Sequence, residues 1–330
     1  MERTIFTNRW YALKPSKLVK KAPCSVNMLG KDLVLWRNRD DQVVVQGDIC
    51  PHRGAKLSLG KLKKNGTSKC IVCPYHGWQF DSEGTLVQLP AESDSQLLNK
   101  VKIDTVHSME SGGLVWACFG TPLSPSPPVV PEMNNRDWIS VTGQETFEAD
   151  WVTSLENSID LAHVNFVHSD FGDPQNGHVD VEKIKEVSSD HFVMKSTIHH
   201  KSDSILLRFT DNPSVKVTHD VLLPNTISIK FWVRDIMQVI TYVTYTPIKG
   251  NKTLINWVFL RKPRIPIADA ILNRSFVNGM NKAIREDKLI VESLECPPHR
   301  INIDIDNIQV KFRKQLVTLS HSEPTSMFID

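Results

Sequence analysis

With 330 residues the chain is long enough for two domains, and with 40% hydrophobic and 23% charged residues it does not have the composition of a disordered protein. Its formal net charge of +2 is spread along the sequence, which argues against nucleic acid and acidic lipid as partners. The start lacks a leader-like apolar stretch and no later run reaches the roughly 18 apolar residues of a membrane helix, so the sequence predicts a cytoplasmic protein without a membrane span.

Short runs of β-forming residues, separated by turn formers, occupy residues 10–120 and predict an all-β domain. Examples of these runs are Leu33–Trp36, Val43–Gln46 and Gly113–Phe119. The proline-rich stretch 122–131 can continue neither a helix nor a sheet, so we place the domain boundary there. The predicted parts are a first domain, a connector and a second domain, at residues 1–125, 126–137 and 138–330.

Two pairs of cysteine and histidine lie in the all-β half. Cys50 and His52 form the first pair, and Cys73, twenty-one residues after His52, forms the second with His76. A Rieske [2Fe–2S] cluster takes two thiolates on one iron and two imidazoles on the other, and this pattern supplies both sets. The alternative is a structural zinc site, because Cys70 and Cys73 also form a C-x-x-C pair. We assign no chemistry to the remaining cysteines, Cys24, Cys118 and Cys296.

The segment from Trp151 to His168 has helix-like spacing. It contains two histidines, His163 and His168, and the acidic residue Asp160. Two imidazoles and one carboxylate on one face of Fe(II) leave positions open for dioxygen and substrate, as in non-haem iron oxygenases. Since a regular helix would rotate His163 and His168 by about 140° from each other, we expect the helix to break or bulge between them. Asp160 is expected to accept a hydrogen bond from the ring nitrogen of His163 that does not bind metal.

The remaining sequence predicts an antiparallel meander followed by a helix over Ala268–Leu294. The second domain is therefore a sheet with helices, and the fold class is α+β. The expected strands are Phe192–Ile198, Ser204–Phe209, Val215–Leu223, Thr226–Val233, Met237–Tyr245 and Leu254–Leu260. Six residues of these strands are candidates to line a pocket, although core packing would explain them equally well. They are Leu206, Phe231, Trp232, Met237, Tyr242 and Trp257.

Both cluster loops and the histidine-containing segment resemble the corresponding motifs of Rieske-type non-haem iron oxygenases. The match at the mononuclear-iron motif covers Asn157, Asp160, His163 and His168. The resemblance implies a Rieske domain followed by a helix-grip, START-like catalytic domain, in a head-to-tail homotrimer. In that assembly the acid matching Asp160, with Asn157 as a further catalytic position, carries electrons from the neighbouring chain's cluster, and His76 is the expected cluster partner.

The family takes its third iron ligand from an aspartate on a late helix. The segment Glu286-Asp287-Lys288 is similar to that helix in the homotrimeric demethylase and hydroxylase branch, so Asp287 is the expected ligand, with Glu286 as the alternative. The cofactors implied are a [2Fe–2S] Rieske cluster and a mononuclear Fe(II).

The same resemblance implies a monooxygenase that uses O2 to hydroxylate, or to O- or N-demethylate, a small organic substrate. No Gly-x-Gly-x-x-Gly loop is present, so electrons from NAD(P)H would arrive through a separate reductase, a ferredoxin or both. Three alternatives stay open here. They are a tetrapyrrole or pigment oxygenase of the same superfamily, a non-catalytic Rieske electron carrier, and a zinc-stabilised protein with a START-like ligand pocket.

Overall fold

The computed structural model describes residues 4–66, 68–170, 174–175, 178–182, 184–199, 214–233, 237–262, 269–295, 301–323 and 325–327. The chain divides into two compact units, one consisting mainly of Thr7–Pro127 and the other of Pro128–Thr246 with Asn251–Thr325. This division falls inside the stretch expected to be a connector. The expected strand Ser204–Phe209, with Leu206, lies outside the described residues, as do Cys296 and the side chain of Met237.

The first unit contains three antiparallel sheets and no α-helix among its described residues, which confirms the all-β prediction. The sheets have the orders β10-β11-β2, β3-β4-β5 and β6-β7-β8-β9. The run Leu33–Trp36 is buried on both faces of its strand, and this explains why its hydrophobic residues are continuous rather than alternating. The strands are β2 (Tyr11–Pro15), β3 (Cys24–Met28), β4 (Lys31–Arg37), β5 (Val43–Gly47), β6 (Lys61–Asn65), β7 (Ser68–Val72), β8 (Gln79–Phe80), β9 (Leu86–Gln88), β10 (His107–Ser111) and β11 (Leu114–Cys118). Short 3-10 helices follow β2 and β5, at Ser16–Leu18 and Leu57–Leu59.

The second unit is built on one eight-stranded sheet in the order β12-β19-β18-β17-β16-β15-β13, with β14 paired to β15. Antiparallel ladders join β12 to β19, and join β18 through β17 and β16 to β15 and β13. The strands are β12 (Ile139–Phe147), β13 (Val179–Val181), β14 (Lys185–Ser188), β15 (His191–His199), β16 (Ser214–Leu222), β17 (Thr226–Val233), β18 (Met237–Ile248) and β19 (Lys252–Lys262). Strands β1 (Thr4–Phe6) and β20 (Thr325–Met327) lie near the chain ends, and 3-10 turns lie at Pro131–Asn134 and Asp304–Asp306.

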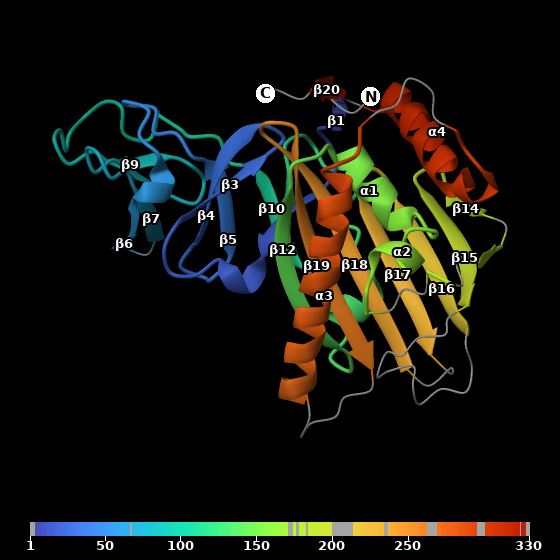
Figure 1. Ribbon diagram of the computed structural model, residues 1–330. Helices are drawn as coiled ribbons and strands as arrows, with labels where there is room; N and C mark the ends of the chain where they lie inside the picture. Colours follow the sequence, from blue (N-terminus) through green and yellow to red (C-terminus); the bar gives the residue numbers. More distant parts are fainter. Residues whose placement is uncertain are drawn as a thin grey trace. The chain divides into compact units, whose positions relative to one another are not determined.

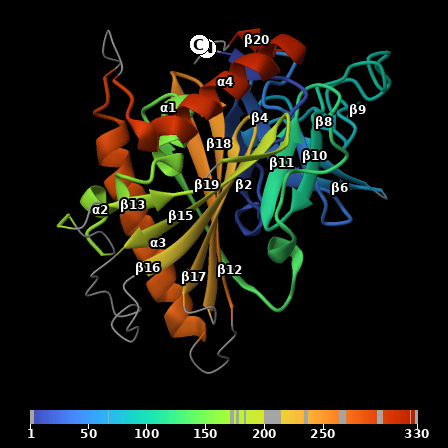
Figure 2. The same ribbon diagram turned by 90° about the vertical axis from the view of Figure 1, so that its right-hand side faces the viewer.

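Helices cover one face of this sheet. Both views place α1 (Trp151–Ile159), α2 (Val164–Val167) and α3 (Asp269–Val291) on the same side of the strands (Figure 1, Figure 2). Apolar side chains of α1, α3 and α4 (Asn307–Ser322) form one buried cluster with alternate residues of the strands. We call the side of the sheet that faces this cluster the core face. Among the described residues, no helix is both long and apolar enough to cross a bilayer.

Many elements of the second unit agree with expectation, and several were missed. The helix expected over Ala268–Leu294 is α3, and the described expected strands are present with small differences at their ends. The segment from Trp151 to His168 forms two helices instead of one. Helix α4 and strands β12, β13 and β14 were not predicted. Of the expected pocket residues, Tyr242 and Trp257 are fully buried in the packed interior.

Candidate metal centres

The two Cys/His loops have the same backbone structure. In the first, the amide of Cys50 donates to the carbonyl of Ala55 (2.9 Å) and the amide of Gly54 donates back to Cys50 (2.9 Å). In the second, Cys73 donates to Trp78 (2.8 Å) and Gly77 donates back to Cys73 (3.1 Å). Gly54 and Gly77 close these turns at φ values of 73° and 72°, a region that side chains disfavour. Cys50 and Cys73 therefore occupy equivalent positions, whereas His52 is the second residue after its cysteine and His76 is the third after its own.

The donors of the two loops face one another. Cys50 and Cys73 are buried with their thiols in contact, and burial raises the pKa of Cys50 to about 11. The rings of His52 and His76 lie 4.6 Å apart, and His52 also stacks on Trp78 at 4.6 Å. The Nδ1 atom of His52 is buried and has no hydrogen-bond partner in the described part of the chain. Two adjacent thiols, two adjacent imidazoles and an unpartnered ring nitrogen fit a Rieske [2Fe–2S] cluster.

The zinc alternative has less support from this geometry. Cys70 lies on β7, fully buried, and burial raises the pKa of its thiol. Among the described residues, no group of three close His, Cys, Asp or Glu ligand atoms includes Cys70. A tetrahedral zinc site would need such a group.

The second candidate centre begins where α1 ends. The Asp160 side chain accepts the backbone amide of Ala162 (2.7 Å), and this turn stops the helix after Ile159. The expected break therefore lies before His163 rather than between His163 and His168. The short helix α2 fills the interval, with His163 at its first cap and His168 at its last, and this brings both rings to the same side. The two ring centroids are 5.3 Å apart.

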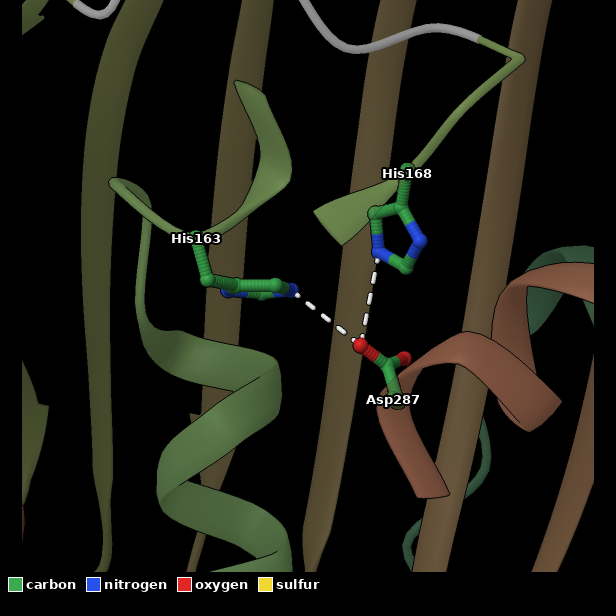
Figure 3. Close-up of side chains that lie close together, drawn as sticks. All are labelled: His163, His168 and Asp287. Atoms are coloured by element: carbon green, nitrogen blue, oxygen red, sulfur yellow. Dashed lines mark ion pairs between the residues drawn. The ribbon is translucent and has the colours of Figure 1, made fainter. Parts of the chain in front are cut away.

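Helix α3 contributes Asp287 to the same place. The Oδ1 atom of Asp287 lies 3.4 Å from Nε2 of His163 and 3.4 Å from Nε2 of His168. One ligand atom from each of the three residues lies within 4.8 Å of the others, and Figure 3 shows the side chains converging in front of the sheet. All three are largely buried. Two imidazoles and one carboxylate at this spacing fit a mononuclear Fe(II) with open coordination positions.

Two acidic residues, Glu286 and Asp160, form hydrogen bonds around these histidines. Glu286, the alternative ligand, instead faces Nδ1 of His168 (3.2 Å) and accepts the hydroxyl of Ser169 (2.6 Å), so that Nε2 of His168 points toward Asp287. Asp160 does not reach the ring of His163 as expected; its Oδ1 atom instead accepts the backbone amides of Ala162 (2.7 Å) and His163 (3.4 Å). The Nδ1 atom of His163 is buried without a partner among the described residues.

Contacts from other elements fix the last turns of α1. Arg313 of α4 forms a two-point ion pair with Glu156, one of its contacts being 2.6 Å from Nη2 to Oε2. The hydroxyl of Tyr245 on β18 donates to Ser158. Asn157 lies in the same turn, half-buried, and its carbonyl accepts the amide of Asp160 (3.2 Å). The loop that carries His163 therefore starts from a well-anchored helix end.

The charges of this centre act on three histidines. Burial lowers the pKa of His163, but the interaction with Asp287 and the charge of Asp160 outweigh it, so the net pKa is raised. Burial, opposed by Asp287, lowers the pKa of His168. Burial and the charge of His163 lower the pKa of His219 on β16 to about 3. Sequence reasoning gave His219 no role, although it alternates with Val217 and Val221 along a strand and so shares their buried face.

Two family models match the chain. The Rieske [2Fe-2S] domain matches residues 9–107, and the vanillate O-demethylase oxygenase C-terminal domain matches residues 147–321, more than half of the chain. The chain is an oxygenase subunit of the Rieske non-haem iron oxygenase family. As a member, this Rieske oxygenase is an O2-dependent oxidoreductase with a [2Fe–2S] cluster and a mononuclear iron, and it hydroxylates or demethylates a small organic substrate with electrons from a reductase.

Individual relatives agree with the family. The 3-chlorobenzoate-3,4-dioxygenase oxygenase subunit of Comamonas testosteroni is 31% identical over 165 residues, which are 48% of this chain and 36% of that protein. Methylxanthine N1-demethylase NdmA of Pseudomonas putida is 24% identical over 343 residues, covering 99% of this chain and 93% of the relative. The crystal structure of dicamba monooxygenase bound to dicamba has a TM-score of 0.84 at 20% identity, covering 97% of this chain and 98% of that one, and it supports the α+β fold.

Proposed function

We propose that this Rieske oxygenase is a monooxygenase that demethylates or hydroxylates a small aromatic or heteroaromatic molecule. The convergence of two imidazoles and one carboxylate within 4.8 Å is the observation that carries the proposal. Relatives that cover nearly the whole chain are methylxanthine N-demethylases, and the model that matches its second half is named for vanillate O-demethylase. These names favour removal of a methyl group from nitrogen or oxygen.

The proposed ligands are those predicted from the sequence. The cluster would be held by Cys50, His52, Cys73 and His76, and the mononuclear iron by His163, His168 and Asp287. Bound Fe(II) supplies the position at which dioxygen is activated beside the substrate. The chain's own residues position that metal: Glu286 orients the ring of His168, and Asp160 shapes the loop that carries His163.

We further propose a head-to-tail homotrimer in which each cluster serves the iron of the neighbouring chain, with Asp160 and Asn157 on the electron path. Family resemblance supports this assembly. Electrons from NAD(P)H would reach the cluster through a separate reductase or ferredoxin, since the chain lacks a Gly-x-Gly-x-x-Gly loop. A cytoplasmic location stays a prediction.

Metal analysis tests the proposal. Protein purified without air should contain about three irons and two acid-labile sulfides per chain, and after reduction its EPR spectrum should have the low average g value of an imidazole-ligated cluster. Asp287→Ala should keep about two irons and both sulfides and lose all turnover. Two irons in the wild-type protein would indicate an electron carrier, and zinc without sulfide would overturn the proposal.

Asp160→Asn separates metal binding from electron transfer. An asparagine side-chain oxygen can still accept the amide of Ala162, so the loop and about three irons should be retained. Because the carboxylate is lost, turnover should nearly disappear. Turnover close to that of the wild-type protein would contradict a role of Asp160 in the electron path.

A further inference from the structure

His219 in the second unit has a buried ring nitrogen that makes no hydrogen bond within the described residues. His219 lies in the middle of β16 on the core face, between Val217 and Val221, with a side chain that is 4% exposed. Across the strands, the sheet register places it opposite Met194 of β15 and Ile229 of β17. Its immediate neighbours on the sheet are therefore apolar.

Two polar atoms on this part of the core face lack partners. Nδ1 of His219 and Oγ of Ser196 are both buried, and neither has a hydrogen bond within the described ranges of the chain. Ser196 pairs with Val217, two residues from His219, so the two side chains are diagonal neighbours on adjacent strands. A buried polar group without a partner is costly, and native proteins usually satisfy it. One polar group placed between these two side chains would satisfy both atoms.

The candidate iron centre lies close by. His163 contributes to the lowered pKa of His219, and this effect requires the two imidazoles to lie near each other. Resting on the proposed function, we propose that His219 and Ser196 form a subsite that binds an uncharged polar group of the substrate. This subsite would hold the substrate's far end while its reactive carbon lies beside the iron.

The chemistry of the two side chains selects the class of group. A hydroxyl and a neutral imidazole each donate and accept, so they match a carbonyl, a hydroxyl or a heteroaromatic nitrogen. A carboxylate would enter an apolar surrounding without a counter-charge from either residue, and its lost hydration would not be replaced. We therefore expect neutral polar substrates to bind in preference to anionic ones at this end.

Stability provides a test that needs no ligand. His219→Leu replaces an unpartnered imidazole by an aliphatic side chain, so the thermal midpoint of the substrate-free holoenzyme should stay the same or rise, with iron and sulfide content unchanged. His191→Leu is the matched control, because His191 lies on the opposite face of the same strand pair and contacts Asp220 (3.3 Å). A larger fall in the midpoint for His219→Leu than for His191→Leu would assign the imidazole to the packing and overturn the proposal.

Binding tests the subsite directly, by calorimetry on iron-loaded protein without air. The probes are three methyl aryl ethers of similar size: 4-methoxybenzamide, 4-methoxybenzoate and 4-isopropylanisole. His219→Leu should weaken the amide about tenfold and change 4-isopropylanisole less than about threefold. Ser196→Ala should weaken the amide in the same direction, which keeps the test usable if the leucine variant does not fold. His191→Leu should leave all three affinities unchanged.

Three results would overturn the subsite. They are an equal loss for the amide and the apolar probe, tighter binding of the benzoate than of the amide to the wild-type protein, and no binding of the amide at all. None of these affects the proposed function, which fails on a separate measurement, namely a wild-type protein that holds only the two irons of the cluster.

Discussion

At the scale of single residues, Glu286 controls how firmly His168 faces the proposed iron. Its carboxylate holds Nδ1 of His168 at 3.2 Å. Removing such an outer partner typically costs about 10–100-fold in metal affinity, so Glu286→Ala should weaken mononuclear iron by that factor while the cluster's sulfide stays unchanged. Competition with a chelator would measure it. Glu295→Ala is the control, because Glu295 is exposed and follows the same helix. Equal iron affinity in both variants would contradict the role of Glu286.

The residues that could be predicted from sequence are those whose partners are local. Cys50 and His52 lie in one turn, and His163 and His168 lie five residues apart. The spacing alone therefore predicted each pair of ligands. Asp287 is far along the chain, and only resemblance to a family proposed it. The expected hydrogen bond from the His163 ring to Asp160 was wrong, because the Asp160 side chain turns back to the amide of Ala162, a local cap that residue spacing does not report. His219 was not singled out from the sequence, because the lack of a hydrogen-bond partner for its Nδ1 atom depends on how the strands pair.

At the scale of elements, Gly143 lies in a closely packed position and Gly279 in an open one. A Cβ on Gly143 of β12 would come within 2.1 Å of the Trp257 ring, whereas a Cβ on Gly279 of α3 would meet nothing within 4 Å. Gly143→Ala should therefore lower the free energy of unfolding by about 1–3 kcal/mol. Gly279→Ala should raise it by about 0.5–1 kcal/mol, since alanine favours a helix interior. Thermal midpoints would check both, and a Gly143→Ala midpoint at or above that of Gly279→Ala would refute the packing argument.

A long element with strong periodicity could be predicted, whereas the position of a helix break could not. Helix α3 is long and repeats its apolar residues at helical intervals, so its ends were placed within three residues. The break after Ile159 depends on a side chain that caps a turn, which periodicity does not report. Helix α4 was not predicted, although its buried side chains recur at helical intervals of four, four and three residues. These side chains are Ile308, Phe312, Leu316 and Leu319, and they pack into the main buried cluster.

At the scale of the whole molecule, each compact unit carries one set of donors. The cluster loops belong to the first unit, and His163, His168 and Asp287 belong to the second. An oxygenase cycle needs electrons to pass from one set to the other. If that transfer runs between chains, a cluster is useful only to a neighbour, and the smallest active species is an oligomer rather than a single chain.

Mixed trimers test this path. Cys73→Ser removes a cluster ligand and Asp287→Ala removes an iron ligand, so each variant alone should be inactive. In the proposed trimer, co-assembled from equal amounts, random neighbours pair an intact iron with an intact cluster at about a quarter of the interfaces, and turnover should recover to about a quarter of the wild-type value. Co-assembly of Cys50→Ser with Cys73→Ser is the control, since neither chain supplies a cluster. If electrons instead moved within one chain, no mixture would regain activity, because every chain would lack one of its two centres.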